Sequence, residues 1–387
     1  HKEYRRQRQM CIRDRDMHTH RALDSIFFRR SSLAGLLLAP GLLAGHALAD
    51  GFVEDSSAKL TTRNYYMDRD YKDDGAKSAA REWAQGFILK MESGYTPGAV
   101  GFGLDVTGLL GVKLDSSPGR SGTELLPVSA SSGRAADEYS RLAPTAKIRA
   151  GKSVLKVGDV SPFLPSIVAS PARLLPQSFR GAYLQSMDIE DLTLNAGYLD
   201  RINRRDSSNY QAMTVASPNR RFNPAAESSH AAFFGGDYQL SKGLKLRAYH
   251  TTVADLYRQE YFGLLHELPV GPGVLSTDLR AFISNEDGSA KAGKVDNRNL
   301  AAQFAYSFDG HRFTLGYMHQ SGETAKPYIS GTESMVISEM AMSSDFLNPK
   351  ERTWQAIYDY DFAAAGVPGL KTLSLIHISE PTRQEAI

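Results

Sequence analysis

The chain alternates apolar and polar residues with a period of two along most of its length, and this pattern excludes a mainly helical fold. Residues 102–115 place Phe, Leu and Val on one face and small or charged residues on the other. Residues 299–308 repeat the pattern, with Leu300 and Phe304 opposite Gln303, and residues 354–362 do so again. Because successive side chains of a strand point to opposite faces, each run predicts a strand with one apolar face. The fold class is therefore all-β.

The connections between these runs alternate between short turns and long polar segments. The short turns are residues 151–153, 241–243 and 309–310, and the long segments are residues 115–139, 203–229, 285–297 and 322–351. Short turns at one end and long loops at the other are typical of a transmembrane antiparallel β-barrel. A soluble sheet alternates in the same way, but the charged polar faces favour a water-filled lumen. Aromatic residues near strand ends fit membrane interfaces: Tyr198, Tyr249, Tyr306, Phe308, Tyr317, Tyr358 and Tyr360.

Residues 17–49 have the features of a secretory signal peptide. Arg29 and Arg30 precede an apolar run, and Ala47-Leu48-Ala49 forms a small-x-small cleavage site. Pro40 interrupts the apolar run, which is shorter than the ~20 residues of a spanning helix. We therefore expect an exported protein that begins its mature part at residue 50.

The two ends of the chain are expected to be non-native. One codon choice for residues 10–15, read on the opposite DNA strand, translates as residues 373–378. This relation is typical of a sequencing adapter read in opposite directions. We therefore predict an adapter-like extension at residues 1–16, an adapter-like tail at residues 373–387, and a barrel at residues 50–372 that lacks its closing strands.

The composition excludes several classes of protein. The only cysteine, Cys11, rules out a disulfide framework and any cysteine-based metal site, and a net charge of +2 gives no indication of nucleic-acid binding. The sequence contains no hydrolase, zinc-protease or nucleotide-binding motif. We therefore expect no catalytic residue, no metal and no cofactor. Two alternatives remain open: an outer-membrane barrel hydrolase of the protease or lipase type, which would use His250, His266, His311 or His319, and a structural barrel with a plugged lumen.

Residues 161–181 cannot form a continuous helix or an interior strand. They contain four prolines, each without an amide donor, yet they are rich in Phe, Leu, Ile and Val. An apolar segment that cannot pair its own backbone must pack inside a larger structure. We therefore predict a proline-rich loop that is folded into the lumen of the barrel. Its only charged residues are Arg173 and Arg180.

Several motifs resemble those of the OprD-type substrate-specific outer-membrane porins. They extend in order from residue 51 to the last motif, Gly366-Val367-Pro368-Gly369-Leu370, so the resemblance covers essentially all of residues 50–370. The others include Gly51-Phe52-Val53-Glu54-Asp55-Ser56-Ser57, Arg63-Asn64-Tyr65-Tyr66-Met67-Asp68-Arg69-Asp70, Trp83-Ala84-Gln85-Gly86-Phe87, Asp137-Glu138-Tyr139-Ser140-Arg141, Ala172-Arg173-Leu174-Leu175-Pro176-Gln177 and Asp255-Leu256-Tyr257-Arg258-Gln259.

The resemblance implies a bacterial outer-membrane channel for passive, selective diffusion of small carboxylate-bearing solutes such as amino acids, peptides and organic or aromatic acids. It implies a barrel of eighteen strands, incomplete here, surrounded by outer-membrane lipid, as a monomer or loose trimer. It also implies a ladder of basic residues along the lumen. Three positions match the motifs that carry this ladder: Arg69, Arg81 and Arg173.

Overall fold

The computed structural model describes residues 51–71, 78–217, 221–337 and 345–380. The predicted signal peptide at residues 17–49 and the adapter-like extension at residues 1–16 lie outside the described residues, as does part of the predicted tail. Among the described residues, no helix is long and apolar enough to cross a membrane.

The main feature of the fold is one antiparallel sheet in which each strand pairs with the next long strand along the chain. Its strands are β1 (Ser57–Asp70), β2 (Ala79–Glu92), β3 (Val100–Ser116), β4 (Glu138–Ala150), β5 (Ser153–Val160), β8 (Ser178–Ser186), β9 (Leu192–Asn203), β13 (Ala231–Ser241), β14 (Leu244–Val253), β15 (Tyr257–Val270), β16 (Gly273–Glu286), β17 (Asp296–Phe308), β18 (His311–Gly322), β19 (Arg352–Asp361) and β20 (Lys371–Glu380). The predicted all-β fold is confirmed.

Short elements lie in the connections. The hairpin of β6 (Phe163–Leu164) and β7 (Ile167–Val168) follows β5, and β10 (Tyr210–Gln211) pairs with the end of β9. The strands β11 (Met213–Thr214) and β12 (Glu227–Ser228) pair with each other, and the 3₁₀ turn η2 (Phe362–Ala365) joins β19 to β20.

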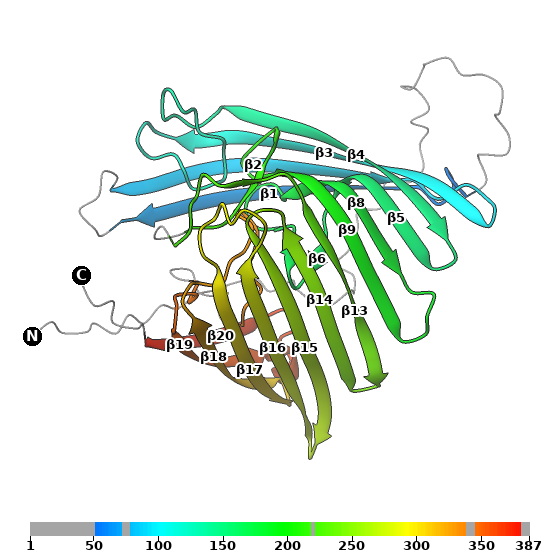
Figure 1. Cartoon of the computed structure of the whole chain (residues 1–387), viewed down its shortest axis with the longest axis vertical. Helices are drawn as coiled ribbons and strands as arrows, with labels where there is room; N and C mark the ends of the chain where they lie inside the picture. Colours follow the sequence, from blue (N-terminus) through cyan, green and yellow to red (C-terminus); the bar gives the residue numbers. More distant parts are fainter. Residues whose placement is uncertain (1–50, 72–77, 218–220, 338–344, 381–387) are drawn as a thin grey trace, which may run out of the picture.

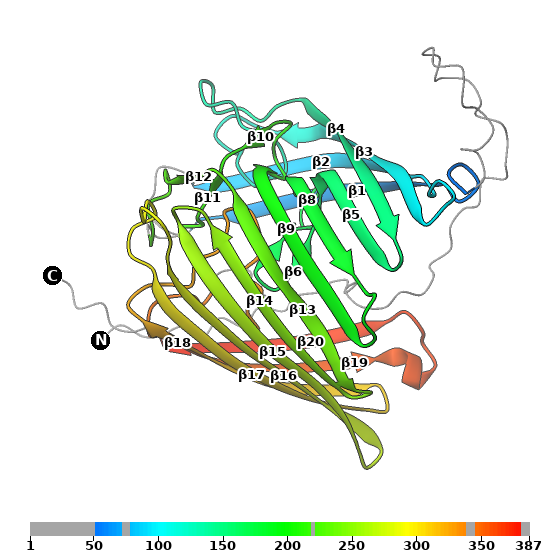
Figure 2. The same cartoon turned by 45° about the vertical axis from the view of Figure 1, so that its right-hand side comes forward.

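The sheet curves strongly, so that its strands form the wall of a trough with a concave and a convex side (Figure 1). Figure 2 shows β1 and β20 at the two edges of this wall. In the described residues β1 pairs with β2 and β20 pairs with β19, without a ladder between β1 and β20. The wall therefore has the form of an incomplete barrel, as the sequence indicated.

The connections alternate in length between the two ends of the wall. One end carries short turns such as residues 309–310, where Asp309 and Gly310 both adopt positive φ angles of 45° and 78°. Two successive positive φ angles match the twist of a hairpin, which explains the Asp-Gly pair. The other end carries long connections at residues 117–137, 204–230 and 323–351. We call it the long-loop end, and the opposite end the short-turn end.

The pleat of each strand separates an exposed apolar face from a buried one. On β2, Trp83 and Phe87 are exposed on the convex side, whereas Ala84 and Ile88 are buried on the concave side. The sequence predicted that Tyr249 lies at a membrane interface, and the structure shows that this prediction is wrong. Tyr249 is 2% exposed on the concave side, because its position on β14 has the inward parity.

The predicted boundary at residue 372 falls at the start of β20. Residues 371–380 pair with β19 in continuous antiparallel register, from Lys371 opposite Asp361 to Glu380 opposite Arg352. The strand alternates like the others, with Ile376 and Ile378 exposed. Pairing of this kind does not test where the residues come from, so the non-native tail stays a prediction.

Candidate functional site

The proline-rich segment lies on the concave side of the wall, where Figure 2 shows β6 within the curve of the sheet. Leu174 and Leu175 are buried in a cluster with Ala84 and Ile88 of β2, while Leu164 and neighbouring residues join a second cluster further along the wall. The predicted inward-folded loop is therefore confirmed. The predicted loop extended to residue 181, whereas β8 already begins at Ser178, two residues after the last proline, Pro176.

Arg63 of β1 fixes the position of this segment. Its Nη1 atom donates hydrogen bonds to the carbonyl oxygens of Pro171, at 2.7 Å, and of Arg173, at 3.0 Å. Arg173 has a φ angle of 72°, a left-handed conformation that non-glycine residues rarely adopt. On the neighbouring strand β2, directly opposite Arg63, a Cβ atom at Gly86 would lie 3.1 Å from Leu174 Cγ, so the glycine allows the close approach of the loop.

A further connection folds onto the concave side. Lys326, in the connection between β18 and β19, is 2% exposed, donates to the carbonyl oxygen of Ser334 at 2.8 Å, and lies 4.1 Å from the centre of the Phe282 ring. Glu333 of the same connection accepts a hydrogen bond from Ser170 Oγ at 2.9 Å. From its sequence, this connection was expected only to be a long polar segment. Its apolar residues Ile329, Val336 and Leu347, all buried, were the signal that could have indicated an inward fold.

The structure brings two of the three predicted ladder residues to the concave side. Arg69 shares the partly buried face of β1 with Arg63 and Met67. Arg173 lies in the inward-folded loop, and its Nε atom is buried without a hydrogen-bond partner in the described structure. Neither arginine forms an ion pair with a described residue.

Arg81 is not brought together with them. It occupies the convex face of β2, with Trp83 and Phe87, and its Nη2 atom forms an ion pair with Asp68 Oδ2 at 2.7 Å. Arg81 was expected in the lumen, and the structure corrects this expectation. Its neighbours Ala80 and Glu82 occupy the concave face, so Arg81 must point to the convex side. Arg180, which the sequence left undecided, also lies on the convex side and pairs with Asp200.

Arg141 and Arg205 also lie on the concave side. The sequence had not indicated either of them as a ladder position. Arg141 of β4 has buried Nε and Nη1 atoms without hydrogen-bond partners among the described residues. Arg205, in the connection after β9, donates to the carbonyl oxygen of Gly331. Burial lowers the pKa of Arg205; Glu124 opposes this effect, and nearby Arg173 adds to it. Arg205 and Arg173 therefore lie close enough to interact electrostatically.

Three other basic residues of the concave face are each paired with an aspartate. Arg247 donates to Asp237 at 2.9 Å, Arg280 pairs with Asp278 at 2.6 Å, and Lys147 pairs with Asp105 at 2.6 Å. Each pair joins neighbouring inward positions of the wall. The concave side therefore contains two kinds of cation, paired ones on the wall and unpaired arginines around the inward-folded loop.

His250, one of the histidines that the hydrolase alternative would use, lies beside a carboxylate. His250 hydrogen-bonds Glu260 through Nδ1, and its Nε2 atom lies 3.1 Å from Thr252 Oγ1. Glu260 is the cross-strand partner of His250, and Thr252 is two residues further along the same strand. All three lie on the convex face, where the centre of the Phe234 ring is 5.2 Å from that of the His250 ring. Ordinary pairing on an antiparallel sheet accounts for the contact, and it faces away from the concave side.

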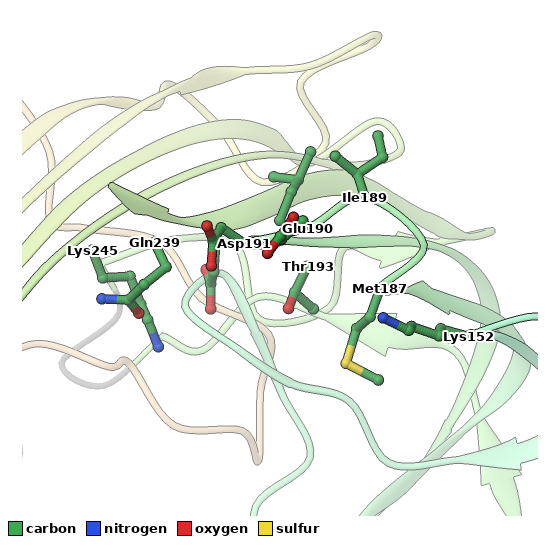
Figure 3. A pocket seen from close by; sticks show the side chains of 10 residues that line it. Lys152, Met187, Ile189, Glu190, Asp191, Thr193, Gln239 and Lys245 are labelled. Carbon is green, nitrogen blue, oxygen red and sulfur yellow. The ribbon is translucent and has the colours of Figure 1, made fainter. Parts of the chain in front are cut away.

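A cavity of about 380 Å³ opens at the short-turn end, shown from close by in Figure 3. The turn after β8 supplies Glu190 and Asp191, β9 supplies Thr193, and Lys152 and Lys245 come from neighbouring turns and strands. Its lining carries charges of both signs. The cavity lies at the mouth of the concave side, away from the unpaired arginines.

A curved antiparallel wall with an apolar convex face, polar cations on the concave side and loops folded inward has the architecture of a membrane channel of the porin class. Comparison with known proteins gives the family. Residues 50–378 match the OprD family of outer membrane porins, and the chain belongs to this family. It is a protein of the outer membrane.

Individual relatives agree with this assignment. The chain is 37% identical to the porin-like protein GalP of Pseudomonas putida, over 85% of this chain and 79% of that protein. It resembles the crystal structure of Pseudomonas aeruginosa OccK9 (OpdG), with a TM-score of 0.83 and 37% identity over 87% of this chain and 86% of the other. Pseudomonas aeruginosa OpdK, solved with vanillate, gives a TM-score of 0.78 and 38% identity over 84% and 83% of the two chains.

Proposed function

We propose that this porin passes small carboxylate-bearing solutes by passive diffusion, guided by the unpaired arginines of the concave side. The observation that carries the proposal is the difference in pairing between cations. Arg69, Arg141 and Arg173 have no ion pair with a described residue, whereas Arg247 and Arg280 each have an aspartate. The unpaired guanidinium groups remain available to an anionic solute.

The chemistry of arginine suits this task. A guanidinium group stays charged at all physiological pH values and presents a planar set of donors to a carboxylate. Several such groups in series give overlapping weak sites, so that a solute is attracted without being held. Low-dielectric walls concentrate the electric field of a narrow passage and raise the local concentration of anions.

The positions of the residues support a pathway along the inward-folded loop. Arg69 lies near the long-loop end of β1, Arg63 holds the loop, and Arg173 and Arg205 interact beside it. A solute that moves inward from the long-loop end would meet these groups in turn. Arg81 is left out of the proposed pathway because it lies on the convex face. Among relatives, OpdK was solved with vanillate, an aromatic carboxylate, which fits the same solute class.

Liposome swelling with the purified protein tests the proposal. We expect Arg173→Gln and Arg69→Gln each to slow entry of a monocarboxylate about fivefold relative to a neutral sugar, because an exposed contact of this kind contributes up to about 1 kcal/mol. Lys242→Gln, an exposed charge in the turn between β13 and β14, is the control and should leave the ratio unchanged. Equal slowing of carboxylate and sugar would contradict guidance by charge. No entry of any solute through the unmodified protein would favour a plugged barrel.

A further inference from the structure

The convex face carries a second set of arginines, at the long-loop end of the wall. Five strands that start from this end place an exposed arginine within their first three residues: Arg81 on β2, Arg180 on β8, Arg258 on β15, Arg298 on β17 and Arg352 on β19. Each points outward, since it is exposed and the residue that precedes it is buried on the concave side. We call these five residues the arginine rim.

Pairing divides the rim into two parts. Arg81 and Arg180 each form an ion pair with an aspartate of the neighbouring strand, Asp68 or Asp200. Among the residues whose side chains the structure describes, none forms an ion pair or a hydrogen bond with the side chain of Arg258, Arg298 or Arg352. These three lie on alternate strands of one continuous stretch of wall, from β15 to β19.

The register places the three unpaired arginines at a similar level. Arg258 pairs with Asn285, Arg298 with Ile283 and Arg352 with His319. Going from β15 to β17 to β19, each arginine is therefore paired closer to the short-turn end than the one before. The ends of the strands shift in the same direction. Strands of a barrel wall are tilted by about 35–45°, so a displacement of this kind keeps residues at one height in the membrane.

Apolar side chains lie below the unpaired arginines on the same face, directly for Arg298 and Arg352 and after Glu260 for Arg258. Phe262 follows on β15, Leu300 on β17 and Trp354 on β19, with exposures of 52%, 50% and 57%. At the short-turn end, the convex face carries tyrosines instead of arginines on two of these strands. They are Tyr306 on β17 and Tyr358 on β19. The arginines therefore lie at the boundary between the apolar band and the headgroup layer, at one end of the wall.

We propose that Arg258, Arg298 and Arg352 bind the phosphate groups of phosphorylated lipids in the leaflet on the long-loop side. Unpaired arginines at this depth match phosphate in charge, and the guanidinium fork binds its oxygens in pairs. In outer-membrane barrels the longer loops face outward, so the lipids belong to the outer leaflet. Carboxylates also lie near the rim: Glu286 is close enough to Arg258 to interact electrostatically, and Glu380 stands opposite Arg352 in the register. Asp296 lies one outward position beyond Arg298, towards the loops, whereas Glu260 is engaged by His250.

The two tryptophans of the chain provide the readout. Trp354 lies one outward position from Arg352, and Trp83 lies one outward position from Arg81. A Trp83→Phe background therefore reports on lipid beside Arg352 alone. We would reconstitute this protein in phosphatidylcholine vesicles containing either brominated phosphatidic acid or the same amount of brominated phosphatidylcholine, and measure quenching of Trp354.

We expect brominated phosphatidic acid to quench Trp354 at a several-fold lower content than brominated phosphatidylcholine. Arg352→Gln should weaken this preference about fivefold, as expected for one arginine at a charged lipid surface, and the triple change of Arg258, Arg298 and Arg352 to Gln should abolish it. Inorganic phosphate at the same concentration should not compete, because it lacks the bilayer anchor. Competition by free phosphate would overturn the assignment to a lipid.

A charge-matched control removes three exposed lysines of the short-turn end, by Lys59→Gln, Lys90→Gln and Lys242→Gln. It should keep the preference for phosphatidic acid. Equal quenching by both lipids in the unmodified protein, or loss of the preference in the control, would overturn the proposal. Arg352→Lys guards against a folding defect and should retain most of the preference. Solute entry does not depend on this surface, so the result is independent of the proposed transport function.

Discussion

The role of an arginine in this protein depends on the face of the strand that carries it and on whether a carboxylate is within reach. Arg69 and Arg81 lie opposite neighbouring positions of one hairpin, since Arg69 pairs with Ala80 and Asp68 with Arg81. One step along the strand moves a side chain from the concave to the convex side. Arg81 therefore meets Asp68 and the membrane, whereas Arg69 faces the proposed solute path.

At the same scale, Arg63 should determine how firmly the inward-folded loop is held. Arg63→Leu removes two hydrogen bonds from a charged donor to the carbonyl oxygens of Pro171 and Arg173, each contributing about 1.5–3 kcal/mol. We expect faster hydrogen–deuterium exchange in residues 170–175, measured by mass spectrometry. Arg69→Leu, on the same face of β1, is the control and should leave this exchange unchanged. Unaltered exchange in Arg63→Leu would show that apolar packing alone holds the loop.

At the scale of the elements, the long connections are tied to one another rather than extended into solvent. The connection between β14 and β15 is joined to the one between β16 and β17, where Asp255 accepts hydrogen bonds from Lys291 Nζ and from the Ser289 amide. Ser170 and Glu333 join the proline-rich segment to the connection after β18. Such hydrogen bonds between loops hold them together across the space that the curved wall encloses, and so narrow it.

The Asp255 contact has a defined pH dependence. The hydrogen bond from Lys291, followed by those from Ser289, lowers the pKa of Asp255 from its ordinary value of 3.8 to about 2. Because the pKa in the folded state is the lower one, the stabilisation is present above pH 3.8 and is lost as the pH falls towards 2. Protection of the Ser289 amide from exchange should therefore persist at pH 4 and decrease below pH 3. In Asp255→Asn it should be low at both pH values, and equal protection in the two proteins would refute the contact.

At the scale of the whole molecule, the wall separates two environments with different kinds of cation. The concave side has unpaired arginines beside the inward-folded loops, and the convex side has the arginine rim above an apolar band. In the two proposals, one set of arginines faces the solute and the other faces the lipid. The alternation of every strand in the wall creates this division.

Guidance by charge makes solute entry sensitive to salt. Raising the ionic strength from 0.1 M to 1 M shortens the Debye length from about 10 Å to about 3 Å and screens the field of exposed arginines. We expect entry of a monocarboxylate to fall several-fold relative to a neutral sugar in the swelling assay. Osmotically balanced vesicles at each salt concentration provide the baseline. A ratio that does not change with salt would argue against long-range attraction by the arginines.

Much of the fold was predictable because the side-chain period of a strand is local. The faces of β3 and β17 follow directly from residues 102–115 and 299–308, and the Asp309-Gly310 pair marks its hairpin. The proline-rich segment was predictable for a similar reason, since prolines and apolar residues together exclude both a strand and a solvated loop. The adapter-like ends and the signal peptide stay predictions.

The residues of the site were less predictable. Whether an arginine belongs to the site depends on which face of its strand it occupies and on contacts with residues far away in sequence. Arg81 lies next to a family motif, but its position on β2 has the outward parity. Arg205 joins the concave side only because its connection folds inward to Gly331, 126 residues away in sequence. Neither fact is contained in a local pattern. The aromatic residue Tyr249 was misassigned for the same reason.

The sequence by itself determined that this chain forms an antiparallel wall with one apolar face, turns of two lengths and an apolar, proline-rich loop that must be covered. These properties depend on residues close together in the chain. The tertiary structure alone decided which arginines remain unpaired and which side of the wall they occupy. The physical reason is that a charge is neutralised or left free by its neighbours in space, and strand register and inward-folded loops bring those neighbours from far along the chain.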